Sequence, residues 1–141
     1  KASRVDIETA EHCPAVLADA AQMQSVIVEL MTNAATAARA TPHIRLTAAG
    51  DELADAVLLT VRDDGPGMDE ATVAKAYTPF FSAQQAGRRR GLGLPRAKRY
   101  VENNGGKIWI ESTPGQGTCV WVRLPVAPFA EQTRGPQHDQ R

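Results

Sequence analysis

The sequence feature that most constrains the fold is a long amphipathic helix pattern that begins at Asp19. Apolar residues recur there at spacings of three and four, as on one face of an α-helix: Met23, Val26, Ile27, Leu30 and Ala34. Asp19 is a residue type that favours helix N-caps, and Thr41-Pro42 ends the pattern, because the residue before a proline avoids the helical conformation. The pattern predicts a helix from Asp19 to about Arg39 with one buried face.

Alternating apolar and polar residues predict strands on both sides of this helix. The strands cover residues 4–10, 43–48, 54–63, 107–112 and 118–125, and a short extended segment runs through Val16 and Leu17. We expect the first strand to be half-buried. Gly50, Asp51 and Glu52 predict the turn of one antiparallel hairpin, and residues 114–117 (PGQG) predict the turn of a second.

Two further helices are predicted in the second half of the chain. The first starts at Asp69 and Glu70 and ends near Tyr77, and the second spans residues 91–103 with Pro95 in its first turn and is closed by residues 104–106 (NGG). Residues 78–90 between them predict an exposed loop. We expect a disordered tail from Val126 to the end, where Pro, Gln and Gly accumulate.

The composition bounds the class of protein. The chain has 141 residues, 43% of them hydrophobic, which suits a single globular domain, and its two cysteines, at positions 13 and 119, lack metal-ligand spacing. No run is long enough for a transmembrane helix, and the first residues lack a signal-peptide pattern, so we expect a cytoplasmic domain. The 16 basic and 16 acidic residues cancel, which argues against nucleic acid as a partner.

The polar face of the first helix carries residues that suit chemistry. Glu29 and Asn33 lie four positions apart and therefore point the same way, flanked by Ser25, Thr32 and Thr36. A carboxylate beside a neutral amide suits a site where one group activates a hydroxyl or water and the other offers an oxygen to Mg²⁺. The alternative is a helix face that simply contacts solvent.

A glycine-rich loop follows the strand that ends at Asp63. Residues 63–67 (DDGPG) offer glycines that let a flat ligand approach the backbone, and an ionised Asp accepts hydrogen bonds from an amine such as that of adenine. The alternative is an ordinary turn.

Residues 91–94 (GLGL) open a helix directly after a loop, where free N–H groups and the helix dipole bind phosphate. Basic side chains surround this helix start: Arg88, Arg89, Arg90, Arg96, Lys98 and Arg99. They predict an anion, although a solvated basic loop or a binding patch for protein or nucleic acid is an alternative. The pattern is neither a Walker A loop nor a dinucleotide fingerprint.

Five blocks taken together, ELMTNA, DDGPGM, YTPFF, RGLGL and GGKIWIESTPGQGT, resemble the conserved boxes and closing hairpin of the ATP-binding catalytic domain of sensor histidine kinases. This domain belongs to the GHKL superfamily with the Bergerat fold. The resemblance implies an α/β two-layer sandwich, in which a mixed, largely antiparallel sheet is covered on one face by three helices. It assigns residues 1–125 to the catalytic domain, with a lid at about 78–90, and leaves 126–141 as the tail.

The resemblance also assigns roles to individual residues. Asn33 matches the residue that coordinates Mg²⁺, Asp63 matches the residue that binds the adenine amine, and Glu29 takes the catalytic position. The remaining ATP-binding residues are those of the adenine pocket, the lid and the phosphate loop: Gly65, Gly67, Met68, Phe80, Arg90, Gly91, Leu92, Gly93, Leu94 and Thr118. ATP and Mg²⁺ are the implied cofactors.

The chain departs from the family pattern in several places. Glu29 stands where many of these kinases have Asn, Thr36 where Lys is common, and Arg89-Arg90 where Gly-Thr is common. A lid arginine is then expected to contact the phosphates.

The H-[DE]-x-x-[NT]-P box is missing, so we expect a fragment that lacks its histidine-bearing dimerisation domain. The implied function is transfer of the γ-phosphate of Mg·ATP to a histidine on that domain, in a protein that is homodimeric when complete and acts on a response regulator. The alternatives are a GHKL ATPase in which Glu29 activates water, a serine kinase of the anti-sigma-factor type, or a nucleotide-binding regulatory module without turnover.

Overall fold

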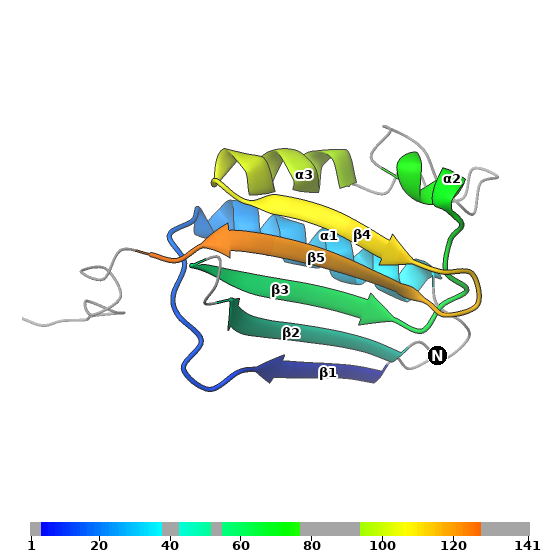
Figure 1. Ribbon diagram of the computed structural model, residues 1–141, viewed down its shortest axis with the longest axis horizontal. Coiled ribbons are helices and arrows are strands. Elements are labelled where there is room, and N and C mark those ends of the chain that lie inside the picture. Colours follow the sequence, from blue (N-terminus) through cyan, green and yellow to red (C-terminus); the bar gives the residue numbers. More distant parts are fainter. Residues whose placement is uncertain (1–3, 38–42, 52–54, 77–93, 128–141) are drawn as a thin grey trace, which may run out of the picture.

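The computed structural model describes residues 4–37, 43–51, 55–76 and 94–127 (Figure 1). It contains these elements in chain order: β1 (Arg4–Thr9), α1 (Ala20–Ala37), β2 (His43–Asp51), β3 (Ala56–Asp63), α2 (Glu70–Ala74), α3 (Leu94–Asn103), β4 (Lys107–Ser112) and β5 (Thr118–Pro125). No helix of the described ranges is long and apolar enough to cross a membrane.

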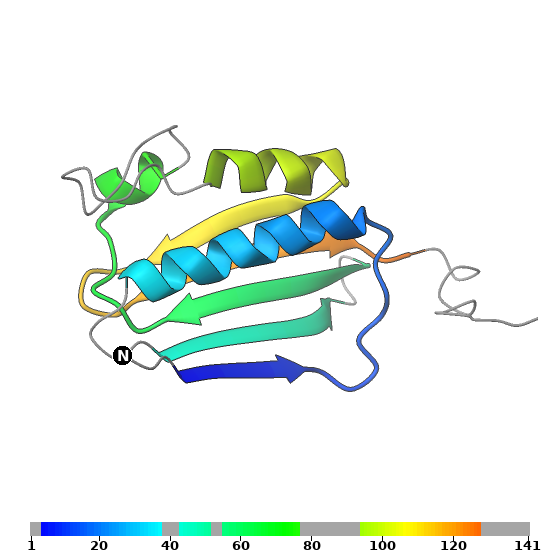
Figure 2. The same ribbon diagram turned by 180° about the vertical axis from the view of Figure 1, so that it is seen from behind.

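The five strands form one mixed sheet in the order β1-β2-β3-β5-β4. β1 runs parallel to β2, and every other neighbouring pair is antiparallel. Figure 2 shows α1 lying across one face of the sheet with α3 beside it, and α2 next to the end of β4. The expected α/β two-layer sandwich with a largely antiparallel sheet is confirmed.

The core lies between α1, α3 and the central strands. The predicted stripe of α1 is buried, with Val26 and Leu30 each 1% exposed, and the sheet contributes Ile44, Val61 and Val122. Each such side chain contributes about 1.5–3 kcal/mol to folding when it is fully buried. The apolar stripe of α1 therefore fixes which face of the sheet the helices cover.

The end of α3 is tied to the start of α1 by Asn104. Its Oδ1 accepts a hydrogen bond from the backbone N–H of Asp19 at 2.9 Å, and its Nδ2 donates to Gln22 and to the carbonyl of Tyr100. Asp19 is also the N-cap of α1, as predicted, because its Oδ1 accepts from the N–H of Gln22 at 2.9 Å. One amide side chain thus serves both helix ends.

The first hairpin turn is placed differently from the prediction. Gly50 and Asp51 are not turn residues, since they pair with Val57 and Ala56 and extend β2. The glycine instead allows close approach of another segment, because a Cβ at position 50 would lie 3.0 Å from Cδ of Pro14. The antiparallel hairpin itself is confirmed.

β1 is more exposed than the half-buried strand predicted by its pattern. Val5 is 42% exposed and Ile7 is 66% exposed. β1 is the edge strand, and α1 packs over β2 and β3. The apolar residues of β1 therefore point to the helical side without a helix to cover them.

Two other boundaries differ. α2 ends at Ala74, with Lys75 as its C-cap, before the predicted end near Tyr77. Val126 forms a single bridge with Val16, and Ala127 is 4% exposed, so these two residues belong to the folded structure and not to a disordered tail. Residues 128–141 lie outside the described ranges.

Candidate active site

A buried carboxylate lies at the end of β3. Asp63 is 7% exposed, and its side chain accepts hydrogen bonds from the backbone N–H of Gly65, at 2.8 Å, and from that of Thr118. Burial raises the pKa of Asp63 above its ordinary value, the two N–H groups oppose this rise, and the charge of Asp64 adds to it. The site therefore presents a hydrogen-bond acceptor where the glycine-rich loop begins.

The loop after Asp63 packs directly against the turn between β4 and β5. Gly67 has φ +75° and Gly117 has φ +83°, a region that favours glycine. A Cβ at position 67 would lie 2.0 Å from the carbonyl oxygen of Thr113, and one at position 117 would lie 2.1 Å from that of Asp63. Both glycines are thus required for this backbone contact, which holds Asp63 in place.

The hydroxyl of Ser112 joins the same two segments. It accepts from the N–H of Met68 at 2.8 Å, lies 2.8 Å from Oγ1 of Thr118, and donates to the carbonyl of Gly117 at 3.0 Å. Since a hydroxyl has a single proton, the Thr118 hydroxyl is then the donor to Ser112. Sequence reasoning did not single out Ser112, although it closes the strand before the turn.

A second group of polar residues faces the start of α3 from α1. Arg96, in the first turn of α3, forms an ion pair with Oε2 of Glu29. The Glu29 side chain is 13% exposed, and its Oε1 is buried without a hydrogen-bond partner within the described ranges. The hydrogen bond and the charge of Glu29 raise the pKa of Arg96. The sequence placed Arg96 only within a basic cluster.

Asn33 lies one turn beyond Glu29 and is half-buried. Figures 1 and 2 both place the C-terminal half of α1 beside the carboxyl end of β3, so Asn33 and Asp63 belong to the same end of the sheet. The side chain of Leu94 is 3% exposed and packs in the core, which leaves only its backbone for an anion. This end of the sheet thus combines the buried acceptor Asp63, two loops whose backbones are in close contact, and the carboxylate and amide of Glu29 and Asn33.

Phe80, Arg90, Gly91, Leu92 and Gly93 lie outside the described residues, as does the expected lid at 78–90.

A comparison with protein-family models identifies the chain. The model described as "Histidine kinase-, DNA gyrase B-, and HSP90-like ATPase" matches residues 18–128. The chain belongs to this family.

Several proteins to which the chain is similar are named as sensor kinases. The chain is 31% identical over 118 residues to the sensor histidine kinase TmoS of Ectopseudomonas mendocina, a match that covers 81% of this chain and 12% of that protein. It is 32% identical over 123 residues to the adaptive-response sensory kinase SasA of Crocosphaera subtropica, covering 80% of this chain and 30% of that protein. The chain thus spans a minor part of the length of these relatives.

Solved structures give the same result. The catalytic domain of histidine kinase ThkA, in a nucleotide-free form, superposes with a TM-score of 0.76 at 28% identity, covering 89% of this chain and 82% of that chain. Full-length ShkA in complex with AMPPNP superposes with a TM-score of 0.77 at 26% identity, covering 89% of this chain and 26% of that one. The fold is that of histidine kinase catalytic domains.

Proposed function

We propose that this chain binds Mg·ATP beside Asp63 and presents the γ-phosphate to a histidine on a separate dimerisation domain of a two-component sensor kinase. The observation that carries the proposal is the buried Asp63 carboxylate, held by Gly65, Thr118 and the close contact with Gly117. An ionised carboxylate accepts a hydrogen bond from the amine of adenine. Gly65, Gly67 and Met68 follow it and would line the adenine pocket.

The polar residues of α1 fit the phosphate end of this ligand. The amide oxygen of Asn33 is a suitable ligand for Mg²⁺, a hard cation that prefers oxygen. Oε1 of Glu29 is buried and lacks a partner in the described residues, which suits a group that is paired only when nucleotide is present. Mg·ATP supplies the phosphoryl group and a cation that offsets its charge.

Arg96 positions Glu29 in this proposal. The ion pair with Oε2 fixes one oxygen of the carboxylate, so the other, Oε1, is turned toward the buried side. In that orientation Oε1 accepts a proton from the attacking group or orients an acceptor imidazole. Free N–H groups at the start of α3 would bind phosphate oxygens. Phe80, Arg90 and residues 91–93 keep the lid and phosphate-loop roles predicted from the sequence.

The partners follow from the relatives. One of the similar solved structures is the histidine kinase ThkA in complex with the response regulator protein TrrA. This supports a response regulator as the downstream partner. Similarity to full-length ShkA with AMPPNP supports ATP as the ligand. We also propose a cytoplasmic location for this domain and a homodimer for the complete protein.

Glu29 favours one second candidate, an ATPase in which water replaces the histidine acceptor. A carboxylate oxygen that is buried and unpaired within the described ranges suits a general base for water.

Calorimetric titration with AMPPNP and Mg²⁺ tests the binding proposal. We expect micromolar to millimolar affinity for the wild type and none detectable for Asp63→Asn, because the amide places a donor where the carboxylate accepts. Asp64→Asn is the matched control, since Asp64 is exposed and its Oδ1 accepts from the N–H of His43 at 3.2 Å. Equal affinity of Asp63→Asn and wild type would overturn the proposed adenine contact.

Radiolabelled ATP separates the two activities. We expect label to reach an added helical domain carrying the acceptor histidine, with little release of free phosphate. Rapid phosphate release that Glu29→Gln abolishes, while AMPPNP still binds, would instead establish the ATPase.

A further inference from the structure

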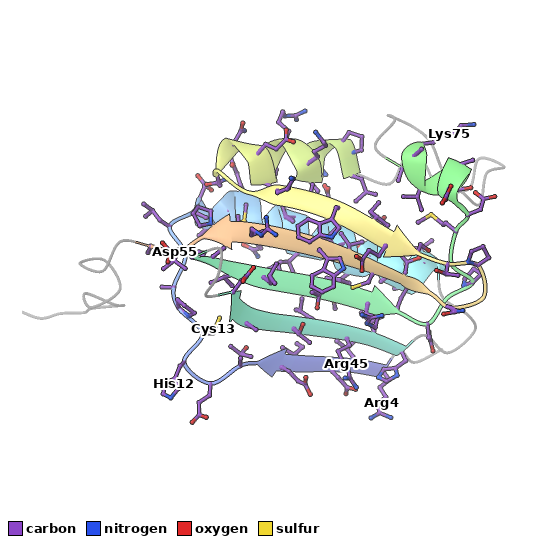
Figure 3. The ribbon with its side chains drawn as sticks, viewed as in Figure 1. Arg4, His12, Cys13, Arg45, Asp55 and Lys75 are labelled. Atoms are coloured by element: carbon purple, nitrogen blue, oxygen red, sulfur yellow. The ribbon has the colours of Figure 1, made fainter. Side chains whose placement is uncertain are left out.

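The face of the sheet opposite the helices carries a cluster of cationic and aromatic side chains. Ile44 and Val61 point into the core, so their neighbours Arg45 and Arg62 project from the other face. Figure 3 shows Arg45 on this open face. Alternation along β4 and β5 places Lys107, Trp109, Trp121 and Arg123 there too. We call these residues the open-face cluster.

Two arginines of the cluster oppose each other. Arg45 and Arg62 are direct cross-strand partners in the β2–β3 register. Like charges in this position destabilise a sheet. Neither arginine forms an ion pair within the described ranges, and both are exposed. The pair therefore has a cost to folding, which the carboxylate of Asp6, opposite Arg45 on β1, offsets only in part.

Two nearby carboxylates have other partners, and a third, Glu8 beside Thr47, is exposed and forms no ion pair with either arginine within the described ranges. Asp6, whose register partner is Arg45, accepts a hydrogen bond from Nε2 of His43 at 2.8 Å and forms an ion pair with Arg4 at 3.5 Å. Glu111 accepts a hydrogen bond from the indole N–H of Trp121 at 2.9 Å. The positive charge of Arg45 and Arg62 is thus available to an external anion.

A hollow of about 310 Å³ adjoins the two arginines. Its other lining residues are Thr47, Thr60, Leu58 and Trp121, together with Ala49. The hydroxyls of Thr47 and Thr60 bond to each other, and polar and apolar atoms line the hollow in nearly equal shares. The hollow therefore combines two cations with an apolar part that Leu58, Ala49 and Trp121 provide.

We propose that the open-face cluster docks an acidic segment of a partner protein, in which an Asp or Glu is adjacent to an aliphatic residue. The carboxylate pairs with Arg45 and Arg62, since guanidinium groups bind carboxylates in a bidentate manner. The aliphatic side chain enters the hollow and contacts Leu58 and Trp121.

Protein is favoured over single-stranded nucleic acid as the occupant. Nucleic acid needs aromatic faces on which bases stack. Here the rings of Trp109 and Trp121 are parallel, with centroids 5.8 Å apart, and the guanidinium of Arg123 lies 5.1 Å from the centre of Trp109. These contacts cover part of both rings, so less ring surface is left on which bases could stack.

Selection from random peptides displayed on phage tests the proposal directly. We expect peptides retained by the wild-type chain to carry Asp or Glu next to Leu, Ile or Val. A synthetic copy of such a peptide should lose about tenfold or more in affinity for the double variant Arg45→Glu/Arg62→Glu. Lys98→Glu/Arg99→Glu makes the same charge change on α3 and should leave that affinity unchanged.

Three outcomes would overturn the proposal: retained peptides without acidic residues, equal losses in both double variants, or binding of oligo(dT) that only the Arg45→Glu/Arg62→Glu variant loses. Thermal melting provides the control for folding. The single change Arg62→Glu should raise the melting temperature, because it converts the like-charge pair into an ion pair and its other register partner is the uncharged Cys119. A lower melting temperature would show that the arginine pair serves the fold, which also contradicts the proposal.

Discussion

Replacing Gly117 with Ala tests whether the contact between the two loops holds the candidate site together. A Cβ at this position would lie 2.1 Å from the carbonyl oxygen of Asp63, whereas ordinary contact begins near 3.4 Å. The two backbones would have to separate by about 1.3 Å. Because the crowded carbonyl oxygen belongs to Asp63, the substitution should move the side-chain carboxylate of the same residue, which is proposed to bind adenine.

The loss of stability expected for Gly117→Ala has two parts, one from backbone conformation and one from crowding. Left-handed backbone costs a residue with a Cβ about 1–2 kcal/mol, and crowding into packed surroundings costs about 1–3 kcal/mol. We therefore expect Gly117→Ala to lower the free energy of unfolding by roughly 2–5 kcal/mol. Gly115→Ala separates the parts, because Gly115 also has φ +83° but nothing lies within 4 Å of its Cβ position.

Urea denaturation followed by the fluorescence of Trp109 and Trp121 gives the free energies, and AMPPNP titration gives the affinities. Gly115→Ala should show only the backbone cost of about 1–2 kcal/mol and bind AMPPNP normally. Gly117→Ala should be less stable than this control and should bind more weakly. Equal stability of the two variants would refute the argument from the loop contact.

Three further predictions concern the same site. Removing the Ser112 hydroxyl with Ser112→Ala should cost about 1–3 kcal/mol, because two backbone groups lose their partner, while Thr118→Ser, which keeps its hydroxyl, should cost less in urea denaturation. Burial raises the pKa of Asp63, so the wild type should gain stability relative to Asp63→Asn as pH falls through that raised pKa and lose this gain as pH rises; a pH-independent difference would contradict the shift. In a double-mutant cycle, the losses of stability from Arg96→Ala and Glu29→Gln should be non-additive, and strict additivity would show that the ion pair makes no contribution.

The fold was predictable where local patterns decide it. The stripe through Val26 and Leu30 fixed the helix and its buried face, because helical periodicity alone brings these residues together. Alternation located all five strands. Alternation did not predict that Val5 and Ile7 remain exposed. The pattern predicts which side chains share one face of a strand, but not whether a helix covers that face. Gly50 is likewise a residue type that is common in turns, but in the structure it allows the distant Pro14 to pack closely against β2.

The candidate site was predictable in part. Asp63 and the glycines after it follow a strand, and such a position commonly carries function. The ion pair of Glu29 with Arg96 and the contacts of Ser112 with Met68 depend on segments many residues apart, and one sequence contains no distances. Arg96 was therefore visible only as one basic residue among several.

The tie between Asn104 and Asp19 also bears on the order in which the chain folds. α1 is synthesised early, yet the residue that bonds its first turn comes 85 positions later. Contacts of such long separation form slowly, because a large loop must close first. A ribosome-bound chain that ends before Asn104 should therefore have a frayed first turn in α1, and the helical layer becomes complete only after α3 has emerged and packed.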